Sequence, residues 1–161
     1  VFGRVYWHFR HEPCMMGWVK GSQPEHDSDH SSNSVWEIDW EGKSRVVGNE
    51  YPTQKPVEIF ARPMRKHTQR GDICFEPFSG SGSQLVAAEG LARRCYAMEL
   101  EPVFVDVAVR RWQTLTGREA VLESSGQTWQ QVYIERGGEA GGSEKRRRGN
   151  AAAQRAVAGP H

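Results

Sequence analysis

Short apolar runs open the chain. Arg4 to Phe9 and Glu12 to Val19 are rich in aromatic and aliphatic residues, and a polar Arg-His pair separates them. Runs of this length predict two adjacent strands joined by a tight connection, and Val35 to Ile38 predicts another short strand.

A helical period begins at Pro56, where the missing N–H of proline costs nothing. Val57, Phe60 and Met64 recur at spacings of three and four, as on one face of a helix. Pro63 lies inside this pattern and predicts a kink or a poorly formed turn.

The clearest pattern is an alternation of apolar runs and helical periods. Its elements are a strand over Asp72 to Glu76, a helix over Gln84 to Arg93, a strand over Arg94 to Leu100 and a helix over Pro102 to Thr116, stopped by Gly117. This order, with a glycine-rich turn after the first strand, is typical of the first half of a doubly wound α/β sheet. Both strands are apolar on both faces, as in a parallel sheet covered by helices. A short helix is also expected around Thr128 to Glu135.

Two segments lack such periods. From about Gly137 onward the chain is rich in glycine and alanine and contains the basic run Lys145 to Arg148, which predicts a disordered basic tail. The basic run could contact phosphates, although a solvated tail is the simpler interpretation. Gly21 to Ser34 is dense in polar residues and predicts a loop.

Composition narrows the class of protein. The 161 residues suit one globular domain, and 21 Lys and Arg against 20 Asp and Glu leave a net charge of +1. Any nucleic-acid contact must therefore be local. No apolar run approaches the roughly eighteen residues of a transmembrane helix, and no secretory leader is expected. Three widely spaced cysteines favour a reducing cytoplasm. Because the chain opens at Val1 inside an apolar run, we expect a fragment or a chain whose upstream part is missing.

The glycine-rich turn is the strongest candidate site. Ligands of open parallel sheets bind beyond the carboxyl ends of the strands, where this turn is expected. Gly80 and Gly82 have no Cβ, so their backbone can take a positive φ and lie against a ligand. Glu99, at the end of the second strand, can accept two hydrogen bonds from a ribose diol. An adenosine-type ligand is therefore predicted.

The residues around the turn narrow the choice of ligand. Leu85 stands where the dinucleotide fingerprint requires a third Gly or Ala, and no Gly-Lys-Ser or Gly-Lys-Thr follows. Glu76 and Phe78 suit the cationic sulfonium and ammonium groups of S-adenosylmethionine. The alternative is an ordinary strand-to-helix turn without a ligand.

Three motifs carry a resemblance to a family. Pro52-Thr53-Gln54-Lys55-Pro56, Glu76-Pro77-Phe78-Ser79-Gly80-Ser81-Gly82 and Met98-Glu99-Leu100-Glu101-Pro102 occur in this order. The chain resembles the DNA amino-methyltransferases that modify N6 of adenine or N4 of cytosine, and in particular the C-terminal part of the permuted branch, in which the catalytic half comes first. The resemblance implies a Rossmann-like S-adenosylmethionine-dependent methyltransferase sheet with helices on both faces, incomplete at its N-terminus.

The resemblance also implies an organisation and a cofactor site. Residues 1–20 would be edge strands, 21–50 a loop or small target-recognition segment, 51–136 the S-adenosylmethionine-binding part and 137–161 the tail. The implied cofactor-binding residues are Thr53, Gln54, Lys55, Glu76, Pro77, Phe78, Ser79, Gly80, Ser81, Gly82, Ser83, Glu99 and Leu100. Glu76 and Ser83 depart from the Asp and Thr that are usual in the family.

No Asp-Pro-Pro-Tyr, Asn-Pro-Pro-Tyr or Ser-Pro-Pro-Tyr motif occurs in these residues. Methyl transfer to a flipped base needs such an acceptor, so we assign no catalytic residue and expect this chain alone to bind cofactor weakly or not at all and to transfer no methyl group. Double-stranded DNA is the expected partner, no membrane contact is expected, and a homodimer stays open. The target base, the recognition sequence and the role in restriction, phage biology or regulation stay open as well.

Other residues allow competing interpretations. A non-enzymatic nucleic-acid binding module is the alternative function, in which Trp36 and Trp40 either stack on bases or pack against the sheet. Lys55 is expected to contact a carboxylate such as Glu76. Arg110, Arg111 and Trp112 are interpreted as a solvated helix face with one buried ring. His8, His11 and Cys14 have spacings that a metal site could use, but paired Cys-x-x-Cys motifs are absent, so no metal is expected.

Overall fold

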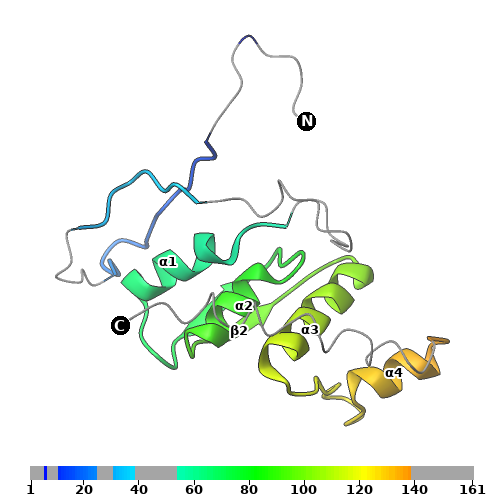
Figure 1. Cartoon of the computed structure of the whole chain (residues 1–161). Helices are drawn as coiled ribbons and strands as arrows, with labels where there is room; N and C mark the ends of the chain where they lie inside the picture. Colours follow the sequence, from blue (N-terminus) through cyan, green and yellow to red (C-terminus); the bar gives the residue numbers. More distant parts are fainter. Residues whose placement is uncertain (1–5, 7–10, 25–30, 39–53, 139–161) are drawn as a thin grey trace.

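The computed structural model describes residues 6, 11–24, 31–38 and 54–138. Its elements are α1 (Val57–His67), β1 (Ile73–Glu76), α2 (Ser83–Gly90), β2 (Arg94–Ala97), α3 (Pro102–Thr116) and α4 (Trp129–Glu135), in that order (Figure 1). The expected order of strand, turn, helix, strand and helix is confirmed. The expected tail beyond residue 138, most of the first strand and part of the target-recognition segment lie outside the described residues.

The two strands form a parallel pair. Cys74 is opposite Cys95 and Phe75 is opposite Tyr96. α2 connects the strands and packs with α1 on one face of the sheet. That face contains the hydrophobic core, whose buried members are Ala61, Met64, Cys74, Ala87 and Ala88, with Val57, Phe60, Leu91 and Cys95 packed against them. The fold class is therefore α/β with a Rossmann-like parallel sheet.

The other face of the sheet carries exposed apolar side chains. Ile73, Phe75 and Tyr96 are 58%, 60% and 57% exposed. Parallel sheets are normally covered on both faces, whereas the core of the described part lies on one face only. The helices that the resemblance implies for the second face are thus not among the described elements.

The ends of two helices follow from local sequence. α3 has Pro102 in its first turn, and Gly117 ends it with a φ of 69°, a conformation that favours glycine. α4 begins after Thr128, whose side chain accepts from the N–H of Gln131 in a capping box. α1 runs through Pro63 as one helix, so the poorly formed turn that was one of the two expectations there does not occur. The buried Ala61 and Met64 on either side of Pro63 hold this helix against α2.

Two strand predictions are wrong. Glu12 to Val19 and Val35 to Ile38 contain no strand. A strand requires a neighbour with which to form a ladder, and in the described part of the chain only β1 and β2 pair in this way. Met15 and Val19 are 97% and 78% exposed, so burial does not fix this segment either.

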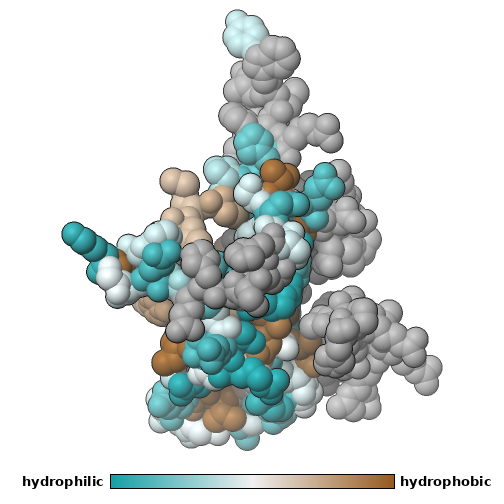
Figure 2. All heavy atoms as spheres, turned by 90° about the vertical axis from the view of Figure 1, so that its left-hand side faces the viewer, coloured by the Kyte–Doolittle hydropathy of each residue, from teal (hydrophilic) through white to brown (hydrophobic). Residues whose placement is uncertain are grey.

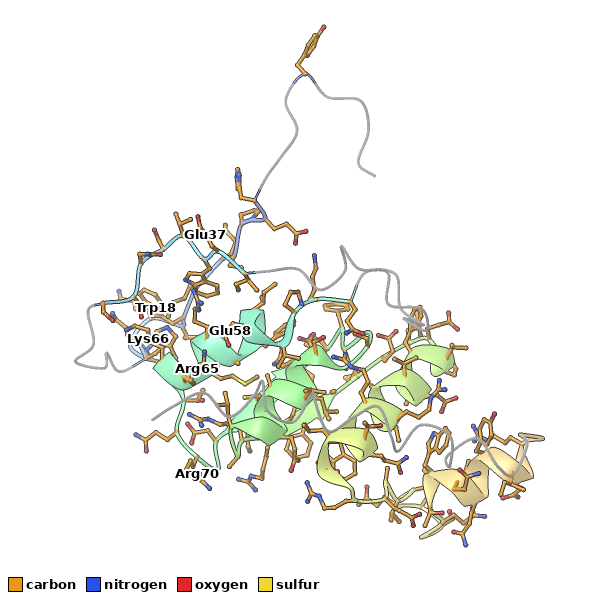
Figure 3. All side chains as sticks on the ribbon, viewed as in Figure 1. Trp18, Glu37, Glu58, Arg65, Lys66 and Arg70 are labelled. Atoms are coloured by element: carbon orange, nitrogen blue, oxygen red, sulfur yellow. The ribbon has the colours of Figure 1, made fainter. Side chains whose placement is uncertain are left out.

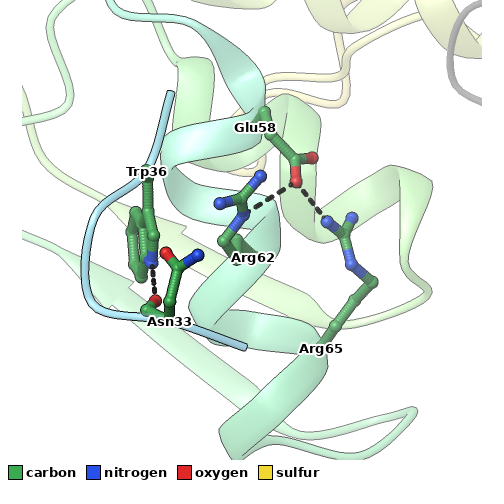
Figure 4. A network of polar contacts seen from close by, with 5 residues as sticks. All are labelled: Asn33, Trp36, Glu58, Arg62 and Arg65. Carbon is green, nitrogen blue, oxygen red and sulfur yellow. Dashed lines mark hydrogen bonds and ion pairs between the residues drawn. The ribbon is translucent and has the colours of Figure 1, made fainter. Parts of the chain in front are cut away.

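Trp36 packs on α1. Its Nε1 donates a 3.0 Å hydrogen bond to the carbonyl of Asn33, and the guanidinium of Arg62 lies 5.3 Å from its ring centroid (Figure 4). Glu58 accepts hydrogen bonds from both Arg62 and Arg65. Of the two interpretations of Trp36, packing within the protein is the one observed, on a helix rather than on the sheet.

The surface beside α1 is charged. Glu58, Arg65 and Lys66 lie along the helix, and Arg70 lies beyond its end (Figure 3). Viewed from that side, hydrophilic side chains predominate and hydrophobic ones are scattered between them (Figure 2). Over the described ranges, none of the helices combines the length and the apolar character that crossing a bilayer would require.

Candidate functional site

The glycine-rich turn lies at the paired carboxyl ends of the two strands. The N–H of Met98 donates a 2.8 Å hydrogen bond to the carbonyl of Glu76, and the N–H of Ser79 donates a 2.9 Å bond to the carbonyl of Met98. Gly80 and Gly82 have φ values of 51° and 75°. The positive φ predicted for both glycines is confirmed, and the turn is fixed to the end of β2.

Glu99 contacts this turn directly. Its Oε2 accepts a 2.6 Å hydrogen bond from the N–H of Gly80, and its Oε1 accepts a 3.0 Å bond from the N–H of Glu101. The N–H groups of Glu101 and Gly80 lower the pKa of Glu99 below its ordinary value because they stabilise the carboxylate. The structure therefore brings Glu99 and Gly80 together.

Gly82 has a different neighbour from the one we expected. A Cβ at this position would lie 2.7 Å from the Cβ of Ala108 in α3. The missing side chain of Gly82 therefore allows helix α3 to approach the turn, and the space above it is filled by Ala108 rather than left for a ligand. The side of Gly82 on which a Cβ would lie faces α3, and contact between the Gly82 backbone and the cofactor stays a prediction.

Arg111 of α3 holds the turn from the same side as Ala108. Its Nη1 lies 2.5 Å from the carbonyl oxygen of Ser81, 2.9 Å from Ser81 Oγ and 3.2 Å from Ser83 Oγ. No local pattern separates Arg111 from Arg110, and the expectation of a solvated face is wrong for Arg111. Arg111 lies three residues after Ala108 and therefore on the same face of α3, but the packing of α3 decides that this face meets the turn.

The motif before α1 is joined to the turn by Ser83. Ser83 Oγ donates a 2.7 Å hydrogen bond to the carbonyl of Lys55. The Lys55 ammonium lies 2.6 Å from Glu12 Oε2, which corrects the expected contact with Glu76. Glu76 instead accepts a 2.8 Å bond from the N–H of Phe78. Gln54 is half-buried next to Lys55, and Thr53 lies outside the described residues.

Open apolar groups lie around the same turn. Phe78, Met98 and Leu100 are 86%, 60% and 97% exposed. Phe78 offers a free ring face to an adenosine or a sulfonium cation. The oxygens of Glu99 each have a further lone pair for a ribose hydroxyl. An aromatic ring face and a carboxylate that accepts hydrogen bonds fit the sulfonium and ribose groups of S-adenosylmethionine, which is the methyl donor of the family to which these motifs point.

A separate hollow of about 360 Å³ lies between α2 and α3 and includes Leu85, Cys95, Trp112 and Val121 in its lining. Burial raises the pKa of Cys95 to about 11, and the nearby Cys74 thiol adds to the effect.

Within the parts of the chain that the structure describes, no group of three or more His, Cys, Asp or Glu side chains could hold a metal ion.

Comparisons with known proteins agree with these motifs. A family model described as DNA methylase matches residues 7–110. The type II methyltransferase M2.MboI of Moraxella bovis is 30% identical over 90 residues, which are 56% of this chain and 33% of the relative. M2.DpnII of Streptococcus pneumoniae is 32% identical over 77 residues, which are 48% of this chain and 29% of the relative.

Two solved structures are also similar over part of the chain. They are the M1.HpyAVI–SAM complex (33% identity, TM-score 0.37, 38% of this chain and 32% of that one) and a putative DNA modification methylase from Thermus thermophilus complexed with S-adenosyl-L-methionine (32% identity, TM-score 0.36, 40% and 27%). The chain spans about a third of the length of the relatives it matches. The family model covers more than half of the 161 residues, and on that basis this chain belongs to the DNA methylase family.

Proposed function

We propose that this chain is the cofactor-binding part of a DNA methyltransferase that transfers a methyl group from S-adenosylmethionine to N6 of adenine or N4 of cytosine. The observation that carries the proposal is the contact between Glu99 and Gly80 at the paired ends of β1 and β2. In a member of the DNA methylase family, this is the edge of a parallel sheet where a nucleotide-like ligand binds.

Each segment has a role in cofactor binding. The Glu99 carboxylate accepts hydrogen bonds from the ribose hydroxyls while it keeps its bond to Gly80. The exposed ring of Phe78 covers an apolar or cationic part of the cofactor, and Gln54 and Lys55 border its methionine end. S-adenosylmethionine, when bound, supplies an electrophilic methyl group. The residues of this chain bind and orient it.

In this proposal, methyl transfer requires the whole enzyme and is not carried out by this chain alone. The 161 residues contain no Pro-Pro-Tyr motif to hold the exocyclic amine, and the matched relatives are about three times as long as the matched segment. A flipped base requires such an acceptor and a stacking partner. The exposed face of Ile73, Phe75 and Tyr96 is the surface on which the remaining part of the sheet domain would pack.

Equilibrium dialysis with methyl-tritiated S-adenosylmethionine tests the proposal. Because the turn is already ordered by its bond to Glu99, we now expect weak, saturable binding to the full chain rather than none. We also expect weaker binding to Glu99→Gln and no transfer of label to double-stranded DNA. Glu101→Gln is the matched control. Glu101 lies two residues after Glu99 and its side chain is exposed, so the variant removes the same charge nearby. Absence of saturable binding to the wild-type chain would contradict cofactor binding, and equal affinity in Glu99→Gln would contradict the role of Glu99. Label on DNA would show that this chain transfers the methyl group by itself.

The competing function, a non-enzymatic nucleic-acid binding module, has less support. Trp36, one of the two tryptophans it relied on, packs beneath Arg62. Trp40 lies outside the described residues. Cofactor binding that depends on Glu99 would separate the two functions.

A further inference from the structure

We infer that Arg111 is a positioning residue for the cofactor site, because it holds together the two segments that the site requires. This inference rests on the proposed function. Arg111 lies in α3, and its Nη1 is within hydrogen-bond distance of the Ser81 carbonyl and of the Ser81 and Ser83 hydroxyls. Both serines are almost fully buried, at 3% and 4% exposure.

The contacts continue from the turn to the segment before α1. Ser83 Oγ receives a hydrogen bond from Arg111 and donates its own hydrogen to the carbonyl of Lys55 at 2.7 Å. A hydroxyl that accepts one bond and donates another fixes the direction of both. Arg111, Ser83 and Lys55 therefore form one chain of hydrogen bonds between α3 and both cofactor-binding segments.

The guanidinium also compensates for the backbone conformation of the turn. Gly80 and Gly82 both have positive φ, and each lies next to Ser81 in the sequence. The Ser81 carbonyl, between these two glycines, is oriented by the charged donor at 2.5 Å. Charge-assisted hydrogen bonds are stronger than neutral ones, so this contact favours the turn conformation in which the Gly80 N–H points at Glu99. Arg111 thereby acts on the cofactor through Glu99 and Gly80.

Arg111→Met tests this inference, with Arg110→Met as the matched control. Arg110 is on the same helix and loses the same charge, but its Nε donates to the Asp106 carbonyl and its guanidinium lies 6.0 Å from the ring centroid of Trp129. We expect amide hydrogen exchange of Ser79, Gly80 and Gly82 to rise by about tenfold or more in Arg111→Met. Exchange in α1 stays unchanged, and Arg110→Met behaves as wild type at the turn. Arg111→Lys recovers part of the protection, because an ammonium can donate to one of the three oxygens.

The affinity for S-adenosylmethionine provides the second readout. We expect it to fall by about tenfold in Arg111→Met and to change less than twofold in Arg110→Met. Unchanged exchange at the turn in Arg111→Met, or an equal rise throughout the chain, would overturn the inference. If the wild-type chain binds no cofactor, the proposed function fails, and the exchange measurement still decides whether Arg111 holds the turn.

Discussion

The Oε2 atom of Glu99 accepts a 2.6 Å hydrogen bond from the backbone N–H of Gly80. This bond joins the segment after β2 to the glycine-rich turn after β1. A site whose turn is ordered by its own hydrogen bonds loses less conformational entropy when it binds a cofactor. The carboxylate therefore serves both the turn and, in our proposal, the ribose.

Acidification should release the turn. The N–H groups of Glu101 and Gly80 lower the pKa of Glu99, so the folded state holds the carboxylate charged where an unfolded chain would begin to protonate it. The stabilisation is thus complete above the ordinary glutamate pKa of about 4.3 and is lost as pH falls below it through the lowered folded value. We expect hydrogen exchange at Gly80, after correction for the intrinsic rate, to accelerate in that window. Glu99→Gln should show no such transition, and a wild-type profile that matches the variant would refute this assignment.

Gly82→Ala should destabilise the chain more than Gly71→Ala does. Both glycines have positive φ, at 75° and 88°, so alanine is strained at either position by about 1–2 kcal/mol. At Gly82 the new Cβ would also lie 2.7 Å from the Cβ of Ala108, whereas at Gly71 nothing lies within 4 Å. Overpacking of this kind adds about 1–3 kcal/mol. Urea unfolding of the two variants measures the difference, and equal losses would show that α3 does not press on the turn.

The three thiols should differ in reactivity. Cys14 is exposed, Cys74 is buried and Cys95 is intermediate. Burial raises the pKa of Cys74 and raises that of Cys95 to about 11, so few thiolates form at either site at pH 8. We expect iodoacetamide at pH 8 to label Cys14 at least about tenfold faster than the other two, as read by peptide mass spectrometry. Labelling of Cys95 as fast as Cys14 would contradict the packing of β2 against α2.

The open face of the sheet should tolerate polar substitution in this chain. Phe75 is 60% exposed, whereas Met64 on the covered face is 6% exposed. We expect Phe75→Ser to change the free energy of unfolding by less than about 0.5 kcal/mol and Met64→Ala to cost about 2–5 kcal/mol. Denaturant titration of both variants gives the comparison. A large loss in Phe75→Ser would mean that this face is covered by something within the chain.

The central α/β segment could be predicted because its signals are local. Pro102 and Gly117 mark the ends of α3, and both bounds agree with the structure. Gly71 and Pro77 bound the apolar run that predicted the first strand, and β1 covers Ile73 to Glu76 within it. The short helix expected around Thr128 to Glu135 is present as α4, and the structure adds that Thr128 caps it. In each case the deciding residues lie within a few positions of the element.

The errors arose where distant residues decide. The carboxylate that pairs with Lys55 is 43 residues away at Glu12, and no helical or strand period connects the two. Glu12 to Val19 has the composition of a strand but no strand beside it among the described residues. Arg111 differs from Arg110 only in the face of α3 it occupies relative to Ser81, which depends on how α3 packs on the turn. Tertiary contacts of this kind leave no local pattern.

Titration of the ¹⁵N-labelled chain with S-adenosylmethionine shows where on this chain the cofactor binds. We expect the amide signals of Phe78, Gly80, Ser81 and Glu99 to shift together and saturably. The signals of α4 should stay in place, and Glu99→Gln should weaken the response. Shifts confined to the hollow around Leu85 and Trp112, or no shifts at millimolar cofactor, would contradict cofactor binding at the turn.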